Sequence, residues 1–341
     1  MGAVIRQADL DRDRDALIRT HQRYLNPLAD SRRYDWLYRD SPFGQALTWL
    51  AVDGEGEIVG SAALFPRVVF IHGEQRLGGV LGDFCISERH RSLGPALQLQ
   101  KQCLCAVRSG EYSFCYDFPS SIMAGIYHRL GMKETHRMLR LSRPLDLAQR
   151  LRGSRWSSAL LAPTLGRCAN VFLRHQDRPL PGSFRFQEHS EAFDQEFTAL
   201  AYELAPEHGV HTFRSAAYLN WRYRNHPARS YQVITARTAS TQLAGYLIFS
   251  LDQHSASIAD LCCREDAMLL QGLVQSAVSQ ARSAGAASLS FPLLESSRWI
   301  PLLRAMGFLP RESSPLVTYA RAESAQSVMP ELLLLAGDRE S

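Results

Sequence analysis

The chain has 341 residues and 45% hydrophobic residues, and its 38 Lys and Arg against 34 Asp and Glu give a formal net charge of +4. This is globular composition at a length that suits two domains, and the mild charge, with arginines spread along the chain, argues against a nucleic-acid-binding protein. Seven cysteines without a C-x-x-C pair, no long apolar run and an N-terminus that is charged early predict a reduced, cytoplasmic protein without disulfides, zinc or a membrane span.

The first half reads as a helix, several strands and a helical crossover. Gly54, Gly56 and Gly73 mark turns between apolar runs. Meandering strands followed by a helical crossover predict a mixed α/β sheet. In chain order, the expected elements are a helix at 9–24, strands at 48–53, 57–71 and 77–86, a helix at 95–108, a strand at 112–118, a helix at 122–130 and a last strand.

The second half repeats the same order. The expected elements are a helix at 191–204, strands at 230–237, 243–252 and 255–263, a helix at 267–284, a strand at 288–292, a helix at 297–306 and a last strand.

Three short segments recur in both halves in the same order, which predicts an internal duplication. The matching pairs are WLYRDSP (36–42) with WRYRNHP (221–227), GDFCIS (82–87) with ADLCCR (259–264), and YHRLGM (127–132) with LRAMGF (303–308). Because Trp36 and Trp221 occur in both halves, we interpret the first pair as a packing motif. Tyr38, Arg39 and Phe43 are weaker candidates for an acceptor site.

The two halves are joined by a segment rich in arginine, residues 146–182, which has no acidic residue between Asp146 and Asp177. We predict a basic helical linker between an N-terminal domain at 1–145 and a C-terminal domain at 183–341. A peripheral contact with anionic lipid through this linker is the alternative.

A sharp bend lies between the third strand and the next helix of the first half. It carries Arg91 and Gly94, and Pro95 suits the first turn of the helix. Such a bend can point several backbone N–H groups and a helix N-terminus at one anion, and the alternative is a plain turn without a ligand.

The bend and a later segment resemble the GCN5-related N-acetyltransferase (GNAT) superfamily. Residues 91–96 are similar to its Arg/Gln-x-x-Gly-x-Gly/Ala loop, and Tyr127 stands four positions before Gly131, as in that superfamily. The resemblance implies an α/β (mixed α+β) fold of two tandem GNAT-like domains, the second degenerate. Each would be a mixed, mostly antiparallel sheet flanked by helices.

The resemblance also implies an acyl-CoA-dependent N-acyltransferase, most simply an N-acetyltransferase that uses acetyl-CoA and no metal. The acceptor would be an amine on a small molecule or sugar, which attacks the thioester directly. Ser120 stands where the family often has an Asn that binds the cofactor arm. The implied cofactor-binding residues are Phe84, Cys85, Ile86, Arg91, Ser92, Leu93, Gly94, Pro95, Ala96 and Ser120.

Two catalytic roles follow from the same resemblance. Tyr127 would be the general acid that gives a proton to the leaving thiolate. An alkylammonium is mostly protonated at neutral pH, so a base is also expected. Asp83 is the first candidate, Asp117 and Glu88 are the alternatives, and His90 and His128 are weaker candidates.

The second half lacks these signals. Glu265 and Asp266 stand where the anion would lie, and Leu303 replaces the tyrosine. We therefore expect this half to pack on the first and shape the acceptor cleft. Two other functions stay open: a Fem-like transferase that uses aminoacyl-tRNA, and a non-catalytic GNAT scaffold that binds CoA or another ligand.

Overall fold

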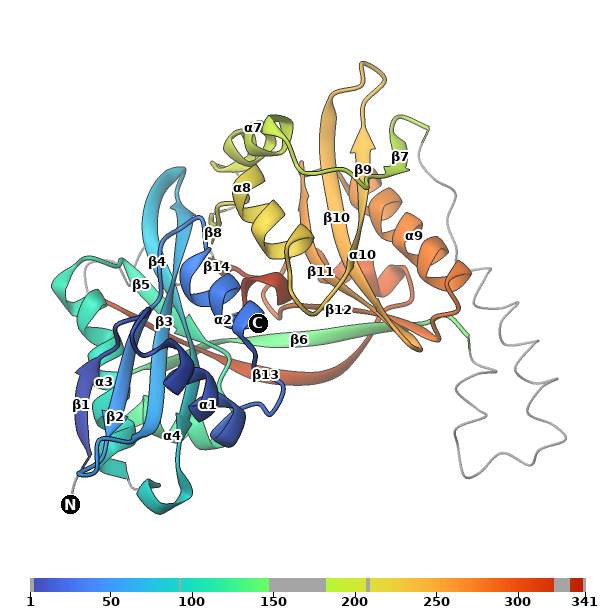
Figure 1. Ribbon diagram of the computed structural model, residues 1–341. Helices are drawn as coiled ribbons and strands as arrows, with labels where there is room; N and C mark the ends of the chain where they lie inside the picture. Colours follow the sequence, from blue (N-terminus) through green and yellow to red (C-terminus); the bar gives the residue numbers. More distant parts are fainter. Residues whose placement is uncertain (1–2, 92, 147–181, 207–208, 322–331, 340–341) are drawn as a thin grey trace, which may run out of the picture.

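The computed structural model of the chain describes residues 3–91, 93–146, 182–206, 209–321 and 332–339 (Figure 1). Of the expected linker at 146–182, only the two end residues are described, so the prediction for this segment lies outside the described residues, as does Ser92.

The N-terminal half forms one end of a large sheet. Its strands and helices begin and end close to the predicted limits; strand β3, for example, starts at Ile58 rather than at residue 57. Strands β1 to β4 pair in chain order and antiparallel, and β5 runs parallel to β4. These elements are β1 (Val4–Gln7), α1 (Arg14–Tyr24), α2 (Ser31–Tyr34), β2 (Leu47–Val52), β3 (Ile58–Ile71), β4 (Glu74–Ile86), α3 (Leu93–Ser109), β5 (Phe114–Asp117) and α4 (Ser121–Arg129).

The C-terminal half forms the other end in the same order of elements. Strands β7, β9, β10 and β11 pair antiparallel in that order, and β12 runs parallel to β11. These elements are β7 (Arg185–Glu188), α7 (Gln195–Leu204), β8 (Val210–Thr212), α8 (Ala216–Leu219), β9 (Tyr231–Arg237), β10 (Leu243–Asp252), β11 (Ser255–Cys263), α9 (Ala267–Ser283), β12 (Ser288–Leu294) and α10 (Ile300–Ala305).

The two halves exchange their last strands. Strand β6 (Lys133–Pro144) leaves the first half and pairs with β12 of the second. Strand β13 (Leu309–Ala320) returns and pairs with β5 of the first half, and β6 and β13 pair with each other. Both long strands bridge the two ends of the molecule in Figure 1.

This exchange joins the strands of the described ranges into one 14-stranded, mostly antiparallel sheet. The predicted class, a mixed α/β fold with a mostly antiparallel sheet flanked by helices, is confirmed. The expected two separate sheets are not found among the described strands. The last strand of each half instead forms its backbone hydrogen bonds with a strand of the other half.

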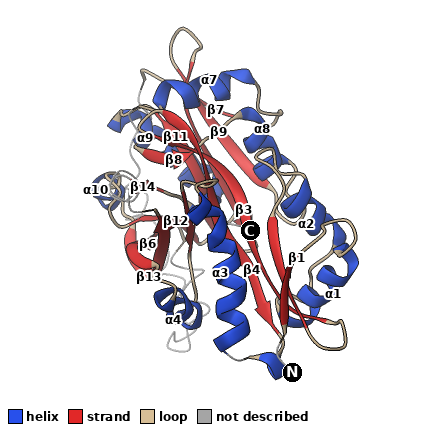
Figure 2. Cartoon of the chain, turned by 90° about the vertical axis from the view of Figure 1, so that its left-hand side faces the viewer, coloured by secondary structure: helices blue, strands red, loops and turns tan. Residues whose placement is uncertain are grey.

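Helices cover both faces of the sheet (Figure 2). In the first half α3 packs on β2 and β3, and α1 packs on β3 and β4. Leu99 and Leu104 on α3 belong to one buried cluster, while Leu17 on α1 belongs to another. The sheet therefore has an α3/α4 face and an α1/α2 face, and this division matters for the site.

Two tryptophans join the halves at their centre. The rings of Trp36 and Trp221 stack at 4.8 Å between centroids, and each indole N–H donates to the backbone oxygen of the other, at 2.8 and 2.7 Å. Arg67 lies over the ring of Trp221 and Arg222 over that of Trp36. The repeated motif is thus a packing element, as interpreted from the sequence.

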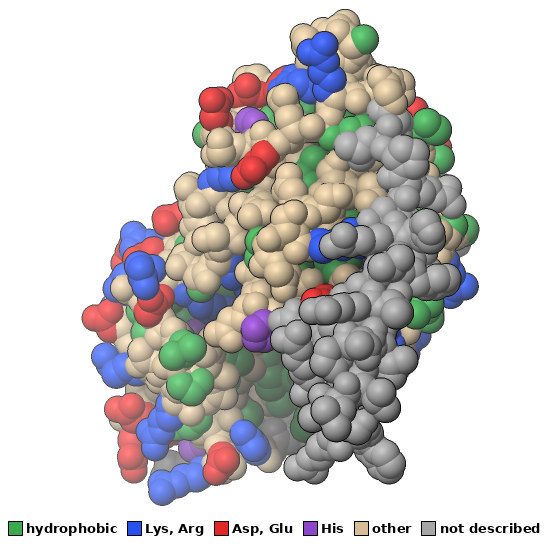
Figure 3. Space-filling view, turned by 90° about the vertical axis from the view of Figure 1, so that its right-hand side faces the viewer, with side chains coloured by type: hydrophobic (Ala, Val, Ile, Leu, Met, Phe, Trp, Pro, Cys, Tyr) green, Lys and Arg blue, Asp and Glu red, His purple; other side chains and the backbone are tan. Residues whose placement is uncertain are grey.

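The described surface mixes both charges. Figure 3 shows basic and acidic side chains interspersed on the face it presents, in keeping with the small net charge. Within the described ranges, no helix has the length and apolar character needed to cross a bilayer.

Candidate active site

A pocket of about 550 Å³ lies where β4 ends, between that strand and helix α4. It brings together six of the ten residues predicted to bind the cofactor: Phe84, Cys85, Ile86, Arg91, Ala96 and Ser120. Five residues that the sequence analysis did not single out complete the wall: Tyr24, Ile122, Met123, Ile126 and Arg129.

Strand β4 presents its backbone to this pocket because the sheet opens there. Strands β4 and β5 pair only at Gly79 and Val80, so within the described strands the end of β4 has no ladder partner on the β5 side. The register with β3 also shifts around Asp83, whose φ is +46°. Such a bulge bends the strand and turns backbone groups out of the ladder, which leaves them available to a ligand.

The predicted anion seat lies at the start of α3. Gly94 is exposed, and a Cβ added to it would meet no atom within 4 Å. The first turn of α3 holds no acidic residue, so the partial positive charge of the helix N-terminus is not neutralised from within. The exposed guanidinium of Arg91 lies 3.9 Å from Glu88. Pro95 is half-buried and offers no N–H.

Ser120 performs a structural task at the pocket wall. It is the N-cap of α4, where its hydroxyl oxygen accepts from the backbone N–H of Met123 at 3.4 Å. This bond leaves the hydroxyl proton available to a ligand, because the oxygen acts only as an acceptor in it.

Asp83 is not among the residues that line the pocket. Its carboxylate accepts two hydrogen bonds from Arg33 and one from the hydroxyl of Tyr38, all at 2.8 Å. Burial raises the pKa of Asp83, but Arg33, His21 and Tyr38 together outweigh burial and leave that pKa below its ordinary value. A carboxylate held in this way takes up a proton less readily than a free one, which weakens the case for Asp83 as base.

The structure does not bring Tyr127 into the pocket wall either. The side chain is buried on the face of α4 that packs in the α3/α4 cluster, and its hydroxyl donates to Asp117 at 2.6 Å. Burial and the Asp117 charge raise the pKa of Tyr127 well above 10. The role of proton donor stays a prediction, and it would require this hydroxyl to leave Asp117.

The second half keeps the Asp–Tyr contact of the first but fills the bend. Tyr223 donates to Asp260 at 2.9 Å, as Tyr38 does to Asp83. Asp266 caps α9 by accepting from the N–H groups of Met268 and Leu269 at 2.7 and 3.1 Å. Its carboxylate therefore sits at the helix end where the first half is open.

A second pocket, of about 570 Å³, lies at the junction of the halves. Its ten lining residues form five pairs, and the two members of each pair are 185 positions apart in sequence. The pairs are 32 and 217, 35 and 220, 36 and 221, 40 and 225, and 42 and 227. Residues at equal offsets in the two halves thus line this pocket together, in keeping with the predicted duplication.

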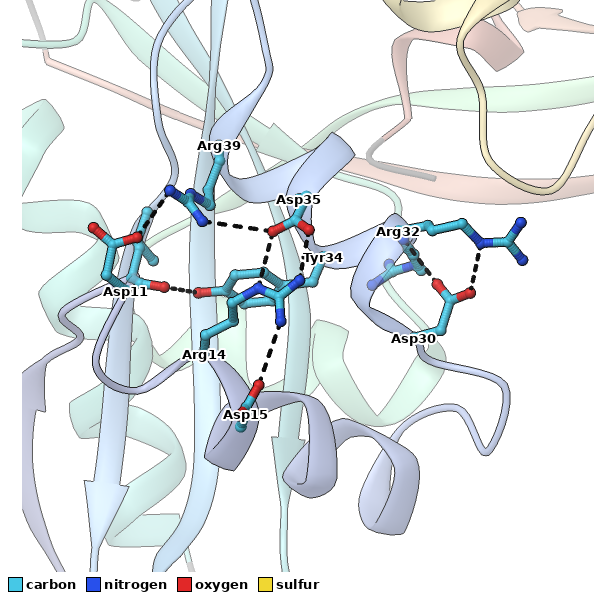
Figure 4. Close-up of polar contacts among 10 residues, drawn as sticks. Asp11, Arg14, Asp15, Asp30, Arg32, Tyr34, Asp35 and Arg39 are labelled. Atoms are coloured by element: carbon cyan, nitrogen blue, oxygen red, sulfur yellow. Dashed lines mark hydrogen bonds and ion pairs between the residues drawn. The ribbon is translucent and has the colours of Figure 1, made fainter.

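Several charges at this junction pocket are already paired (Figure 4). Asp35 accepts two hydrogen bonds from Arg14, at 3.0 and 2.6 Å, and Arg32 pairs with Asp30. These pairs neutralise the charges, so the pocket at the end of β4 is the better candidate for an active site.

Comparison with known proteins defines the class. Residues 10–134 match the family model of an acetyltransferase (GNAT) domain. This part of the chain therefore matches a GNAT domain, the family that the bend and the Tyr-x-x-x-Gly segment predicted. No curated protein matches the chain in sequence.

Solved structures share the fold over nearly the whole chain. A conserved protein of Enterococcus faecalis, titled a probable N-acyltransferase, has a TM-score of 0.68 at 11% identity, covering 94% of this chain and 73% of its own. A GCN5-related N-acetyltransferase from Anabaena variabilis has 0.68 at 13% identity, covering 93% and 72%. Another from Kribbella flavida has 0.63 at 15%, covering 96% and 74%. At these identities the likeness establishes the fold and no more.

Proposed function

We propose that the chain is an acyl-CoA-dependent N-acyltransferase that binds its donor in the pocket at the end of β4. One observation carries the proposal: residues from β4, the bend, α3 and α4, chosen from sequence as cofactor contacts, line a single pocket. The acetyl group of acetyl-CoA is the simplest donor group, and an amine of a small molecule or sugar is the proposed acceptor.

The residues present fit a thioester carrier. The pyrophosphate would lie against the open start of α3, where backbone N–H groups and Arg91 favour an anion. The extended arm would run along the exposed backbone of β4, with the apolar side chains of Met123 and Ile126 on its other side.

The chemistry follows from the same strand. The acceptor amine attacks the thioester carbonyl, the C–N bond forms, and the C–S bond breaks to release the CoA thiolate. Backbone N–H groups at the bulge of β4 would stabilise the charge that develops on the carbonyl oxygen.

Acetyl-CoA titration with the melting temperature as readout tests the donor. A ligand at a hundred times its dissociation constant stabilises by about 2.7 kcal/mol. Unfolding entropy of about 2.1 cal/mol/K per residue over 341 residues makes this a rise of about 4 °C.

Thiol release on a panel of amines then tests the transfer. Stabilisation without thiol release on any amine would favour the non-catalytic scaffold. No stabilisation by acetyl-CoA, by longer acyl-CoA or by CoA itself would refute the proposal.

A further inference from the structure

A row of buried polar side chains leads away from the pocket wall. Cys85 lines the pocket, and its sulfur lies 3.3 Å from the hydroxyl oxygen of Ser61 on β3. That oxygen also lies 3.1 Å from Nε2 of His21 on α1, and the hydroxyl donates to the backbone oxygen of Asp83 at 3.2 Å. All three side chains are buried.

His21 can accept a proton at neutral pH. Its Nδ1 faces Asp83 Oδ2 at 4.0 Å, its ring lies 5.9 Å from that of Tyr38, and Arg33 adds a positive charge nearby. Burial, and then the Arg33 charge, lower the pKa of His21 below 6.5 although Asp83 acts in the opposite direction. The imidazole is therefore neutral at pH 7, and one of its nitrogens carries no proton.

Cys85 is suited to pass a proton rather than to attack the thioester. Burial raises the pKa of its thiol to about 11. The thiolate is the nucleophilic form of cysteine, and very little of it is present at pH 7 with such a pKa. A protonated thiol bonded to a hydroxyl can receive one proton and give up another.

Comparison with the second half distinguishes contacts that both halves share from contacts found only in the half with the pocket. Cys262 lies in β11 opposite Tyr246 of β10, and Cys85 lies in β4 opposite Ser61 of β3, in the same register. Tyr246 thus replaces Ser61 in the half whose bend is filled by its own carboxylate. The Asp–Tyr contact occurs in both halves, so it belongs to the framework, whereas the serine–histidine pair belongs to the half with the pocket.

We propose that His21, reached through Ser61 and Cys85, accepts the proton that the acceptor amine loses during acyl transfer. The inference rests on the proposed function. The neutral amine attacks the carbonyl carbon and its nitrogen becomes cationic in the tetrahedral intermediate. That nitrogen gives a proton to the sulfur of Cys85, and the thiol proton moves to Ser61. The Ser61 hydroxyl, which donates to the backbone oxygen of Asp83 at rest, turns toward His21 and gives its own proton to Nε2. The C–S bond then breaks, the CoA thiolate leaves, and the proton on His21 passes back to the product thiol or to solvent.

This route assigns Asp83 a different task from the one expected. Its oxygens are held by Arg33 and Tyr38, and its negative charge stabilises the imidazolium that forms when His21 is protonated. Asp83 is then a positioning residue, which acts through His21.

The test compares Ser61→Ala and His21→Gln with the wild-type chain, with Tyr246→Phe as the matched control. Ser61→Ala and Tyr246→Phe each remove one hydroxyl at equivalent positions of the two halves. We expect the first two variants to lower kcat at least tenfold at pH 7, with acetyl-CoA affinity within twofold of wild type. Tyr246→Phe should keep kcat within twofold.

The dependence of kcat on pH distinguishes the relay from a structural defect. The wild-type profile should fall on its acid side below pH 6.5, where His21 becomes protonated, and His21→Gln should lack this limb. Because the two residues act in one path, the double variant should be no slower than the slower single variant.

An acid limb that persists in His21→Gln, or losses that multiply in the double variant, would overturn the relay. Cys85→Ala gives an independent arm and should lower kcat as Ser61→Ala does; unchanged kcat there would also refute it. If acetyl-CoA binds and is turned over in every variant at the wild-type rate, only the relay fails. If acetyl-CoA does not bind the wild-type chain, the proposed function fails instead.

Discussion

Replacing Asp83 by asparagine tests whether this carboxylate holds the fold or takes the proton directly. The asparagine has the same size but presents an NH2 donor to Arg33, so the ion pair and at least one hydrogen bond are lost. Breaking a buried pair costs about 3–5 kcal/mol, and the lower end applies because Arg33 can reach water. Its side chain is 19% exposed.

The expected loss of about 3 kcal/mol corresponds to a decrease in melting temperature of about 4 °C, from the same entropy per residue over 341 residues. Asp260→Asn is the matched control, since Asp260 accepts from Arg214 and Tyr223 in the other half. It should also lower the melting temperature, while kcat stays within twofold.

The pH dependence of stability has a definite sign. The pKa of Asp83 is lowered in the folded chain, so its contribution to stability is fully present above the unfolded value of about 4 and is lost as the pH falls from there through the lower folded pKa. The melting curves of wild type and Asp83→Asn should therefore converge below about pH 4. Scanning calorimetry between pH 3 and 8 measures this, and steady-state rates at pH 7 should fall less than tenfold. An unchanged melting temperature with a hundredfold loss of kcat would show that Asp83 is the base and refute this reasoning.

Three further outcomes are expected. Tyr127→Phe removes a buried donor from Asp117 and should cost about 1–3 kcal/mol of stability. If the tyrosine is the predicted proton donor, kcat should also fall at least tenfold at unchanged acetyl-CoA affinity, and a kcat within threefold of wild type would refute that role. Gly94→Glu should leave the melting temperature unchanged, because its side chain enters open space, and should abolish stabilisation by acetyl-CoA; retained binding would place the anion elsewhere. Fragments 1–146 and 147–341 should each aggregate when expressed alone, as seen by gel filtration, and fold when co-expressed; a monomeric, folded 1–146 would contradict the strand exchange.

The secondary structure was predictable because its signals are local. Alternating apolar residues and turn glycines placed β2, β3 and β4 within three residues of their observed limits. Gly56 and Gly73 indeed have φ of +85° and +83°, a conformation that glycine adopts without strain. The exchange of β6 and β13 was not predictable in this way. Both strands follow a helix and a glycine, and no local sequence signal indicates whether each pairs with the sheet of its own half or of the other half.

The position of the candidate pocket was predictable from the sequence, but the direction of its side chains was not. The bend placed Arg91 and Ala96 at the pocket because it is fixed by its neighbours in sequence. On α4 one residue corresponds to about 100° of rotation, so Ile126 faces the pocket while Tyr127 faces the core. The spacing of the pocket-facing residues 122, 126 and 129 is that of one helical face and could have revealed this. His21 carries no such signal, because only the folded sheet brings α1 beside Ser61.

Comparison of the two halves distinguishes residues that maintain the fold from residues that would bind or react with a ligand. Both halves contain the buried Asp–Tyr bond and the stacked tryptophan, as expected for parts of a common framework. They differ where a ligand would lie: Asp266 occupies the helix end in one half, while Gly94 leaves it open in the other. A carboxylate that caps a helix also excludes a phosphate from it, since both need the same N–H groups and carry the same charge. The C-terminal half therefore lacks both features: its anion-binding helix end is occupied, and tyrosine replaces Ser61. This is expected if the open bend and the buried proton path of the N-terminal half serve one reaction.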